Sequence, residues 1–349
     1  MLLVSAPGKV HFIGEHAVVY GEPAIISSIG LRTYVKIDFS KNISFVDMEW
    51  PDISNSWSVE NVLEITEKCE ELWNHDKSSG DFSKLFSFIK ANGYEFYRAS
   101  IIGIAIKALN IKEGFSIEVK SEIPTGSGLG SSASRAVAIT KAIAELFEKN
   151  ISLEKLNEIA FNQEKIIHGN PSGGDNTACC YGGILWFRKS SPKNEIISLK
   201  DEIPYKLENF FLVYTKKPEK TTGELVQMVA KLDEKYREKR IKEIGNLTIK
   251  MREALKERDF EKVKNIINLA QKNLEELKVS CDEIDKLCEN VRKIGGAAKL
   301  CGAGGGGIVL CYHEDKQKLI NLIKNLRYKF WDVDLGVEGV KIENRNSEK

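Results

Sequence analysis

The sequence lacks the features of several large protein classes. Its 349 residues include seven cysteines, an odd number without a CxxC pair, which argues against a disulfide framework or a zinc site. Lysine plus arginine (51) nearly balances aspartate plus glutamate (50), so the net charge of +1 gives no global attraction to nucleic acid or to an anionic membrane. No apolar run approaches the ~20 residues of a membrane span, and the first residues do not form a signal peptide. We therefore expect a cytoplasmic protein with no nucleic-acid or membrane partner.

What is present is typical of a globular protein large enough for two lobes. Hydrophobic residues make up 42% and charged residues 29% of the chain, which is ordinary. Apolar residues alternate where we predict strands and follow helical spacing where we predict helices. The predicted strand segments are 4–48, 115–119, 184–187 and 210–214, and the predicted helical segments are 59–109, 133–147, 153–167 and 223–294. This order predicts an α+β protein with an N-terminal lobe of residues 1–195 and a C-terminal lobe of residues 196–349.

The stretch Pro124–Ala133 (PTGSGLGSSA) is the strongest chemical signal in the chain. Three glycines at alternate positions let the backbone approach a ligand closely, and the helix that follows points its free N–H groups into the loop. Such a loop binds phosphate. The loop is not a Walker A motif, because no GK[ST] follows, and it is not a dinucleotide fingerprint, because the third glycine comes one residue early. The alternative to phosphate binding is a structural turn.

Two acidic residues follow at positions suited to a metal and a substrate. Glu164 lies on the helix predicted for 153–167, with Ser152 as its N-cap, and Asp175 lies in a loop rich in turn formers. A nucleotide site without a P-loop lysine needs a metal or nearby cations. One acid would hold Mg²⁺ and the other would lie beside a substrate hydroxyl, whereas two surface charges are the simpler alternative.

Three stretches together resemble the GHMP kinases, a superfamily of small-molecule kinases. They are residues 6–9 with 14–16 (APGK, GEH), residues 124–133, and residues 299–307 (KLCGAGGGG). Within that superfamily, GEHAVVYG and HGNPSG are similar to the mevalonate kinases. Residues 50–53 and the long helical stretch after them resemble the eukaryotic type.

The resemblance implies a two-lobed fold. The N-terminal lobe would be like domain 2 of ribosomal protein S5, and the C-terminal lobe would be ferredoxin-like with added helices. It also implies phosphorylation of the C5 hydroxyl of (R)-mevalonate by ATP, with Mg²⁺, in the biosynthesis of isoprenoid and sterol precursors. We expect a homodimer. The alternatives are another GHMP small-molecule kinase, acting on phosphomevalonate or a sugar, and a non-catalytic ligand sensor.

The resemblance also implies a role for individual residues. Asp175 would be the base that faces the C5 hydroxyl, and Lys9 beside it would stabilise the transferred phosphoryl group. The residues implied in ATP binding are Gly126, Ser127, Gly128, Leu129, Gly130, Ser131 and Ser132. The implied Mg²⁺ ligands are Ser132 and Glu164. The implied substrate contacts are Lys9, Glu15, His16, Asp175, Thr222 (or its neighbour Thr221) and Gly304.

Two residues depart from the family pattern. Cys301 stands where the family usually carries Thr or Ser, and His11 occupies a position in the first strand that is usually aliphatic. Neither is among the expected catalytic residues, so we expect both departures to affect affinity more than activity.

Overall fold

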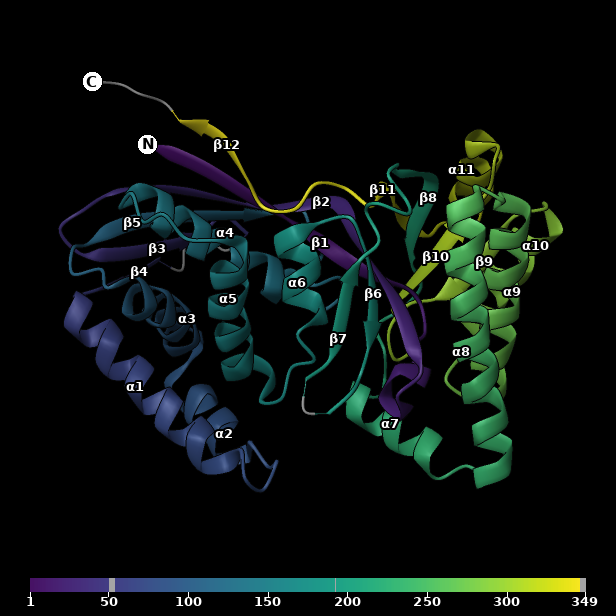
Figure 1. Ribbon diagram of the computed structural model, residues 1–349, viewed down its shortest axis with the longest axis horizontal. Coiled ribbons are helices and arrows are strands. Elements are labelled where there is room, and N and C mark those ends of the chain that lie inside the picture. The colour runs from purple at the N-terminus through teal and green to yellow at the C-terminus, as the bar shows by residue number, and fades with distance from the viewer. Residues whose placement is uncertain (50–53, 192, 346–349) are drawn as a thin grey trace.

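One mixed sheet runs through the whole molecule. In the computed structural model, the described residues (1–49, 54–191 and 193–345) form a sheet of 12 strands (Figure 1). The strands are β1 (Leu2–Ile13), β2 (Pro23–Phe39), β3 (Ile43–Asp47), β4 (Ser54–Trp57), β5 (Phe115–Ser121), β6 (Ile184–Arg188), β7 (Glu195–Ser198), β8 (Leu207–Tyr214), β9 (Ala297–Leu300), β10 (Ile308–Tyr312), β11 (Lys329–Leu335) and β12 (Lys341–Arg345). Their main order is β4-β3-β5-β2-β11-β8-β10-β9.

Strand β2 joins the two halves of the sheet. It pairs with β1 along most of its length and also with β6 through residues 23–27 and with β5 through residues 33–39. Between these two segments, Ile29 pairs with Leu335 of β11, which leads to β8 and the rest of the C-terminal strands. The mixed architecture is the one expected for the GHMP kinase fold.

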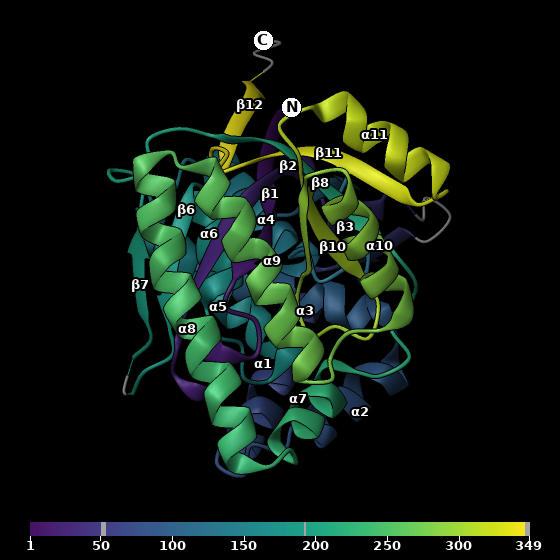
Figure 2. The same ribbon diagram turned by 90° about the vertical axis from the view of Figure 1, so that its right-hand side faces the viewer.

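Helices cover the sheet in two groups. The helices are α1 (Val59–Asp76), α2 (Ser83–Asn92), α3 (Tyr94–Leu109), α4 (Ser131–Leu146), α5 (Leu153–His168), α6 (Gly174–Tyr181), α7 (Thr222–Ala230), α8 (Glu234–Glu257), α9 (Phe260–Glu276), α10 (Asp282–Lys293) and α11 (Lys316–Asn325). Helix α4 packs on β1 and β2, with α3, α5 and α1 outside it, whereas α9 and α10 pack on β9 (Figures 1 and 2). No helix in the described ranges has both the length and the apolarity of a membrane-spanning segment.

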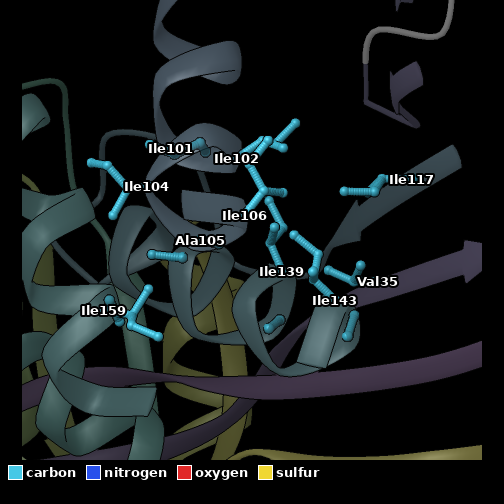
Figure 3. Close-up of a cluster of buried hydrophobic side chains, with 14 of the residues drawn as sticks. Val35, Ile101, Ile102, Ile104, Ala105, Ile106, Ile117, Ile139, Ile143 and Ile159 are labelled. Atoms are coloured by element: carbon cyan, nitrogen blue, oxygen red, sulfur yellow. The ribbon is translucent and has the colours of Figure 1, made fainter. Parts of the chain in front are cut away.

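The larger core cluster lies between the N-terminal strands and their helices. Figure 3 shows isoleucines of α3 and α4, among them Ile102, Ile106 and Ile139, facing Val35 of β2 and Ile117 of β5. All five side chains are at most 1% exposed. Branched aliphatic side chains interdigitate well at such a helix–sheet contact, and full burial of each contributes about 1.5–3 kcal/mol. The core therefore fixes α4 against β1 and β2.

Helix starts follow the capping residues that the sequence provides. Ser152 accepts a hydrogen bond from the backbone N–H of Lys155 (3.2 Å), so the predicted N-cap of α5 is confirmed. Thr221 and Glu224 form a reciprocal capping box at the start of α7. These caps set where each helix begins relative to the strands.

Two local predictions were wrong. Val18, Val19 and Tyr20, assigned to the strand-like segment 4–48, form the short 3₁₀ helix η1 (Ala17–Tyr20) instead. Gly14 (φ 107°) and Gly21 (φ 85°) bracket this turn, so backbone geometry prevails over the strand propensity of the valines. Asp175 lies in the first turn of α6 rather than in a loop, since the helix begins at Gly174 with Gly173 as its N-cap. Residues 50–53, which resemble the eukaryotic type, lie outside the described residues.

The lobe boundary near residue 195 stays a prediction. The sheet is continuous from one half to the other, and β12, from the C-terminal end, pairs with β1. Figure 1 shows β12 beside the start of β1 at one edge of the molecule. The seven cysteines are free thiols.

A tight contact between α1 and α3 gives a test of the N-terminal packing. A Cβ added at Gly103 would lie 1.8 Å from Thr66 Oγ1 and 3.0 Å from the Val62 carbonyl oxygen. Gly103→Ala should therefore destabilise the protein by about 1–2 kcal/mol, because overpacking outweighs the ~1 kcal/mol gain in helix propensity. Urea unfolding measures the change.

Gly223→Ala is the matched control. It is also a helical glycine, and nothing lies within 4 Å of its added Cβ. This control should be neutral or slightly stabilising. Equal stability changes in the two variants would contradict the α1–α3 contact.

Candidate active site

A cavity of about 1160 Å³ lies between the two halves of the molecule. Its walls come from β1, the glycine loop before α4, helices α2, α3 and α6, and the glycine-rich loop between β9 and β10. The predicted site residues that line it are Lys9, Glu15, His16, Gly126, Ser127, Gly128, Gly130, Ser131, Ser132, Asp175, Thr222 and Gly304. Residues far apart in the sequence thus share one cavity.

The glycine loop packs directly on β1. The backbone N–H of Lys9 donates a hydrogen bond to the Leu129 carbonyl oxygen (2.8 Å). A Cβ at Gly130, whose φ is +75°, would lie 2.7 Å from Lys9 Cγ, and a Cβ at Gly8 would lie 2.8 Å from the Leu129 oxygen. The side chain of Leu129 is in the core rather than in the cavity. Glycine at both positions therefore brings Lys9 beside the N-terminus of α4.

Ser132 and Glu164 meet beside this helix start. The Ser132 hydroxyl donates to Glu164 Oε2 (3.3 Å), and Glu164 is 2% exposed. Its other oxygen, Oε1, has no hydrogen-bond partner among the described residues. Burial, reinforced by the charge of Asp175, raises the pKa of Glu164 to about 8. A buried carboxylate with a free oxygen next to a hydroxyl fits a hard divalent cation such as Mg²⁺.

Lys9 and Asp175 form an ion pair that faces the cavity. Lys9 Nζ lies 3.0 Å from Asp175 Oδ2, and the aspartate stands in the first turn of α6. Burial acts to raise the pKa of Asp175, but the charge and hydrogen bond of Lys9 outweigh it and leave that pKa below its usual value. Asp175 is therefore ionised at neutral pH and can accept a proton.

Glu15 and His16 connect β1 to the C-terminal half. Glu15 forms a buried ion pair with Lys299 of β9, and burial raises the pKa of its carboxyl group while Lys299 opposes that shift. His16 Nε2 donates to the carbonyl oxygen of Ala303 (2.9 Å), since a carbonyl can only accept. Both contacts hold the second glycine-rich loop over the cavity.

The structure distinguishes Thr221 from Thr222, which the sequence left as alternatives for one substrate contact. The Thr221 side chain caps α7, whereas Thr222 lines the cavity. Gly304, also at the cavity, has a φ of +92°, and a Cβ there would lie 2.0 Å from the Val279 carbonyl oxygen. The second loop can therefore take this path only with glycine at that position.

Several lining residues were not among the predicted site residues. His11 of β1 lines the cavity, and the alternation of side chains along a strand, which puts it on the same face as Lys9, could have revealed this. Arg135 of α4 lines the cavity and pairs with the buried Asp47 (3.0 Å). The apolar wall contributed by Phe86 and neighbouring residues of α2 and α3 had no local signal, because it depends on how those helices pack.

The chain matches models of one protein family in both halves. The model of the GHMP kinases N terminal domain matches residues 97–183, and that of the GHMP kinases C terminal domain matches residues 251–331. The first match contains the glycine loop and the ion-paired Asp175. The second begins in α8 and contains the second glycine-rich loop.

Named relatives extend the similarity over nearly the whole chain. A mevalonate kinase of Thermococcus sibiricus is 30% identical over 332 residues, covering 90% of this chain and 90% of that protein. A mevalonate kinase of Schizosaccharomyces pombe is 31% identical, covering 98% of this chain and 91% of that protein. The crystal structure of the Methanococcus jannaschii mevalonate kinase superposes with a TM-score of 0.78 at 29% identity and covers 98% of each chain.

The raised pKa of Glu164 predicts a pH dependence of stability. With a pKa of about 8 in the folded state and an ordinary value in the unfolded state, Glu164 binds more protons when folded, so its contribution to stability is lost as pH rises through 8. Glu164→Gln, which carries no charge, should therefore gain stability relative to the wild type between pH 6 and pH 9. Each pKa unit corresponds to about 1.4 kcal/mol, so the gain should be a few kcal/mol.

Urea unfolding with EDTA present, at both pH values, measures this difference. Glu158→Gln, an exposed glutamate on the same helix, is the control. A stability difference between Glu164→Gln and the wild type that does not change with pH would contradict a buried, protonated Glu164.

Proposed function

The chain belongs to the mevalonate kinases of the GHMP kinase family, and from this we propose how its own residues carry out the phosphorylation. The reaction transfers the γ-phosphoryl group of ATP to the C5 hydroxyl of (R)-mevalonate and gives 5-phosphomevalonate, a precursor of isoprenoids and sterols. The observation that carries the proposal is the Lys9–Asp175 ion pair, held beside the glycine loop in a cavity formed by both halves.

We propose that the glycine loop holds the triphosphate of ATP. All residues of the loop from Gly126 to Ser131 except Leu129 line the cavity where α4 begins. The free N–H groups and positive dipole end of that helix favour phosphate. Ser132 and Glu164 would hold Mg²⁺, which would neutralise charge on the phosphate oxygens. The orphaned Oε1 of Glu164 supports this assignment.

Asp175 and Lys9 act on the acceptor. An alcohol has a pKa of about 16, so it is a weak nucleophile, but phosphoryl transfer is loose and needs little deprotonation early on. Asp175 orients the C5 hydroxyl and takes its proton late in the transfer. Lys9 keeps Asp175 ionised and stabilises negative charge on the transferred group.

The remainder of mevalonate lies toward the second glycine-rich loop. Its carboxylate needs a cation or hydrogen-bond donors, and Lys220 lines the cavity from the segment before α7. Glu15, His16, Thr222 and Gly304 form the surrounding wall. The Lys299–Glu15 pair keeps that wall rigid, because Lys299 is fully buried.

A substrate panel tests the assignment. ADP release should be measured with mevalonate, phosphomevalonate and galactose, and we expect turnover with mevalonate alone. Turnover with galactose or phosphomevalonate but not mevalonate would favour another GHMP kinase. A protein that binds ATP without turning over any of these alcohols would favour a ligand sensor.

Asp175→Asn tests the base directly. The variant should lose at least about a hundredfold in kcat, because the amide cannot take the proton, while ATP binding measured by calorimetry should persist. Asp201→Asn, at an exposed position, is the control and should have wild-type kcat. Near-normal turnover by Asp175→Asn would remove Asp175 from the role of base.

We also propose that the enzyme is cytoplasmic and forms a homodimer. Light scattering after size exclusion should give twice the monomer mass. A monomer mass at assay concentration would rule out the homodimer as the active form.

A further inference from the structure

His11 is a polar cavity residue that the mechanism above does not use. It lies two residues after Lys9 on β1, and both side chains line the cavity. Successive side chains of a strand alternate between its faces, so Lys9 and His11 share one face. After His11 the pairing with β2 becomes irregular, and β1 ends just before Glu15. His11 therefore stands between the reaction centre and the wall formed by Glu15 and His16.

The imidazole of His11 is incompletely satisfied by the protein. Its Nδ1 is buried and has no hydrogen-bond partner within the described part of the chain. Buried polar atoms are almost always paired in native structures, so an orphaned one points to a partner from outside the chain. The nitrogen also belongs to a residue that lines the cavity, which is where such a partner would come from.

His11 is uncharged at the pH of any ordinary assay. Burial, with added repulsion from Lys9 and Lys299, lowers its pKa to about 3. A neutral imidazole carries one N–H donor and one acceptor nitrogen but no charge. It is therefore suited to a neutral polar group rather than to balancing a carboxylate or phosphate, for which Lys9 and Lys220 are already present in the cavity.

We propose that His11 is a specificity-determining residue that hydrogen-bonds the tertiary 3-hydroxyl of the acceptor. This inference rests on the proposed function, in which the 5-hydroxyl lies at Lys9 and Asp175. Two strand positions span about 6.6–6.8 Å, and the 3-hydroxyl is borne two carbons along the substrate from the 5-hydroxyl carbon. In an acceptor that extends from Asp175 toward His16, the 3-hydroxyl therefore lies beside His11.

A hydroxyl also satisfies the ring in either tautomer. It can donate to an unprotonated nitrogen or accept from an N–H, whereas a carboxylate can only accept. A site that hydrogen-bonds a substrate hydroxyl also rejects analogues that lack it, because its own polar atom is then left unpaired. His11 thus favours a 3,5-dihydroxy acid over a simple alcohol of the same size.

The test pairs two variants with two substrates. Wild type, His11→Leu and His11→Asn are assayed with mevalonate and with its 3-deoxy analogue, 5-hydroxy-3-methylpentanoate. His11→Leu should raise KM for mevalonate about tenfold, the effect of one lost hydrogen bond to a buried group, and leave KM for ATP within about twofold. With the deoxy analogue the same variant should differ little from wild type. His11→Asn, which keeps a donor and an acceptor, should recover part of the loss.

His75→Leu is the matched control, because His75 is exposed on α1 and does not line the cavity. An unchanged KM for mevalonate in an active His11→Leu would overturn the His11 proposal alone. Equal losses with mevalonate and the deoxy analogue would overturn the hydroxyl contact and leave His11 as a packing residue. Failure of the wild type to turn over mevalonate would overturn the proposed function and this inference together. If His11→Leu does not fold, the same comparisons are made with His11→Asn, whose expected loss is smaller.

Discussion

The close approach of β1 to the glycine loop is the contact on which the active site depends. Gly8 and Gly130 leave no room for a side chain between the two backbones, and the Lys9 N–H closes the gap by bonding the Leu129 carbonyl. This backbone contact places Lys9 at the start of α4, from where its side chain reaches Asp175. The core beneath α4, shown in Figure 3, then fixes the distance from Lys9 to the helices that carry Glu164 and Asp175.

Two carboxyl groups in this site differ in charge because their surroundings differ. Asp175 pairs with a lysine and stays ionised, whereas Glu164 lies behind a serine hydroxyl and is protonated until a cation or high pH removes its proton. Opposite environments for neighbouring acids are a common way to divide roles in an active site. Here the ionised group suits proton transfer, and the group that gains charge only with a cation suits metal binding.

Local structure could be predicted from the sequence better than the way in which distant parts of the chain meet. The glycine loop, the N-cap at Ser152 and the strands around Lys9 follow from residue type and spacing. The start of α6 could not be predicted in this way, because glycines are typical of turns, whereas here Gly173 caps a helix and Gly174 begins it. The Lys299–Glu15 pair joins residues 284 positions apart, and no local pattern encodes such a contact. The position of His11 at the cavity could have been predicted, because side chains alternate along a strand and His11 is therefore on the same face of β1 as Lys9.

The pairing of β12 with β1 has a consequence for how the protein is made. Ser5 hydrogen-bonds Glu343, 338 positions later, so β1 gains this neighbour only after all the residues between the two strands have been synthesised. Until then one edge of β1 carries unpaired backbone groups, which other chains can pair with. Such long-range pairing slows folding. A chaperone that covers this edge of the nascent β1 would therefore raise the yield of native enzyme.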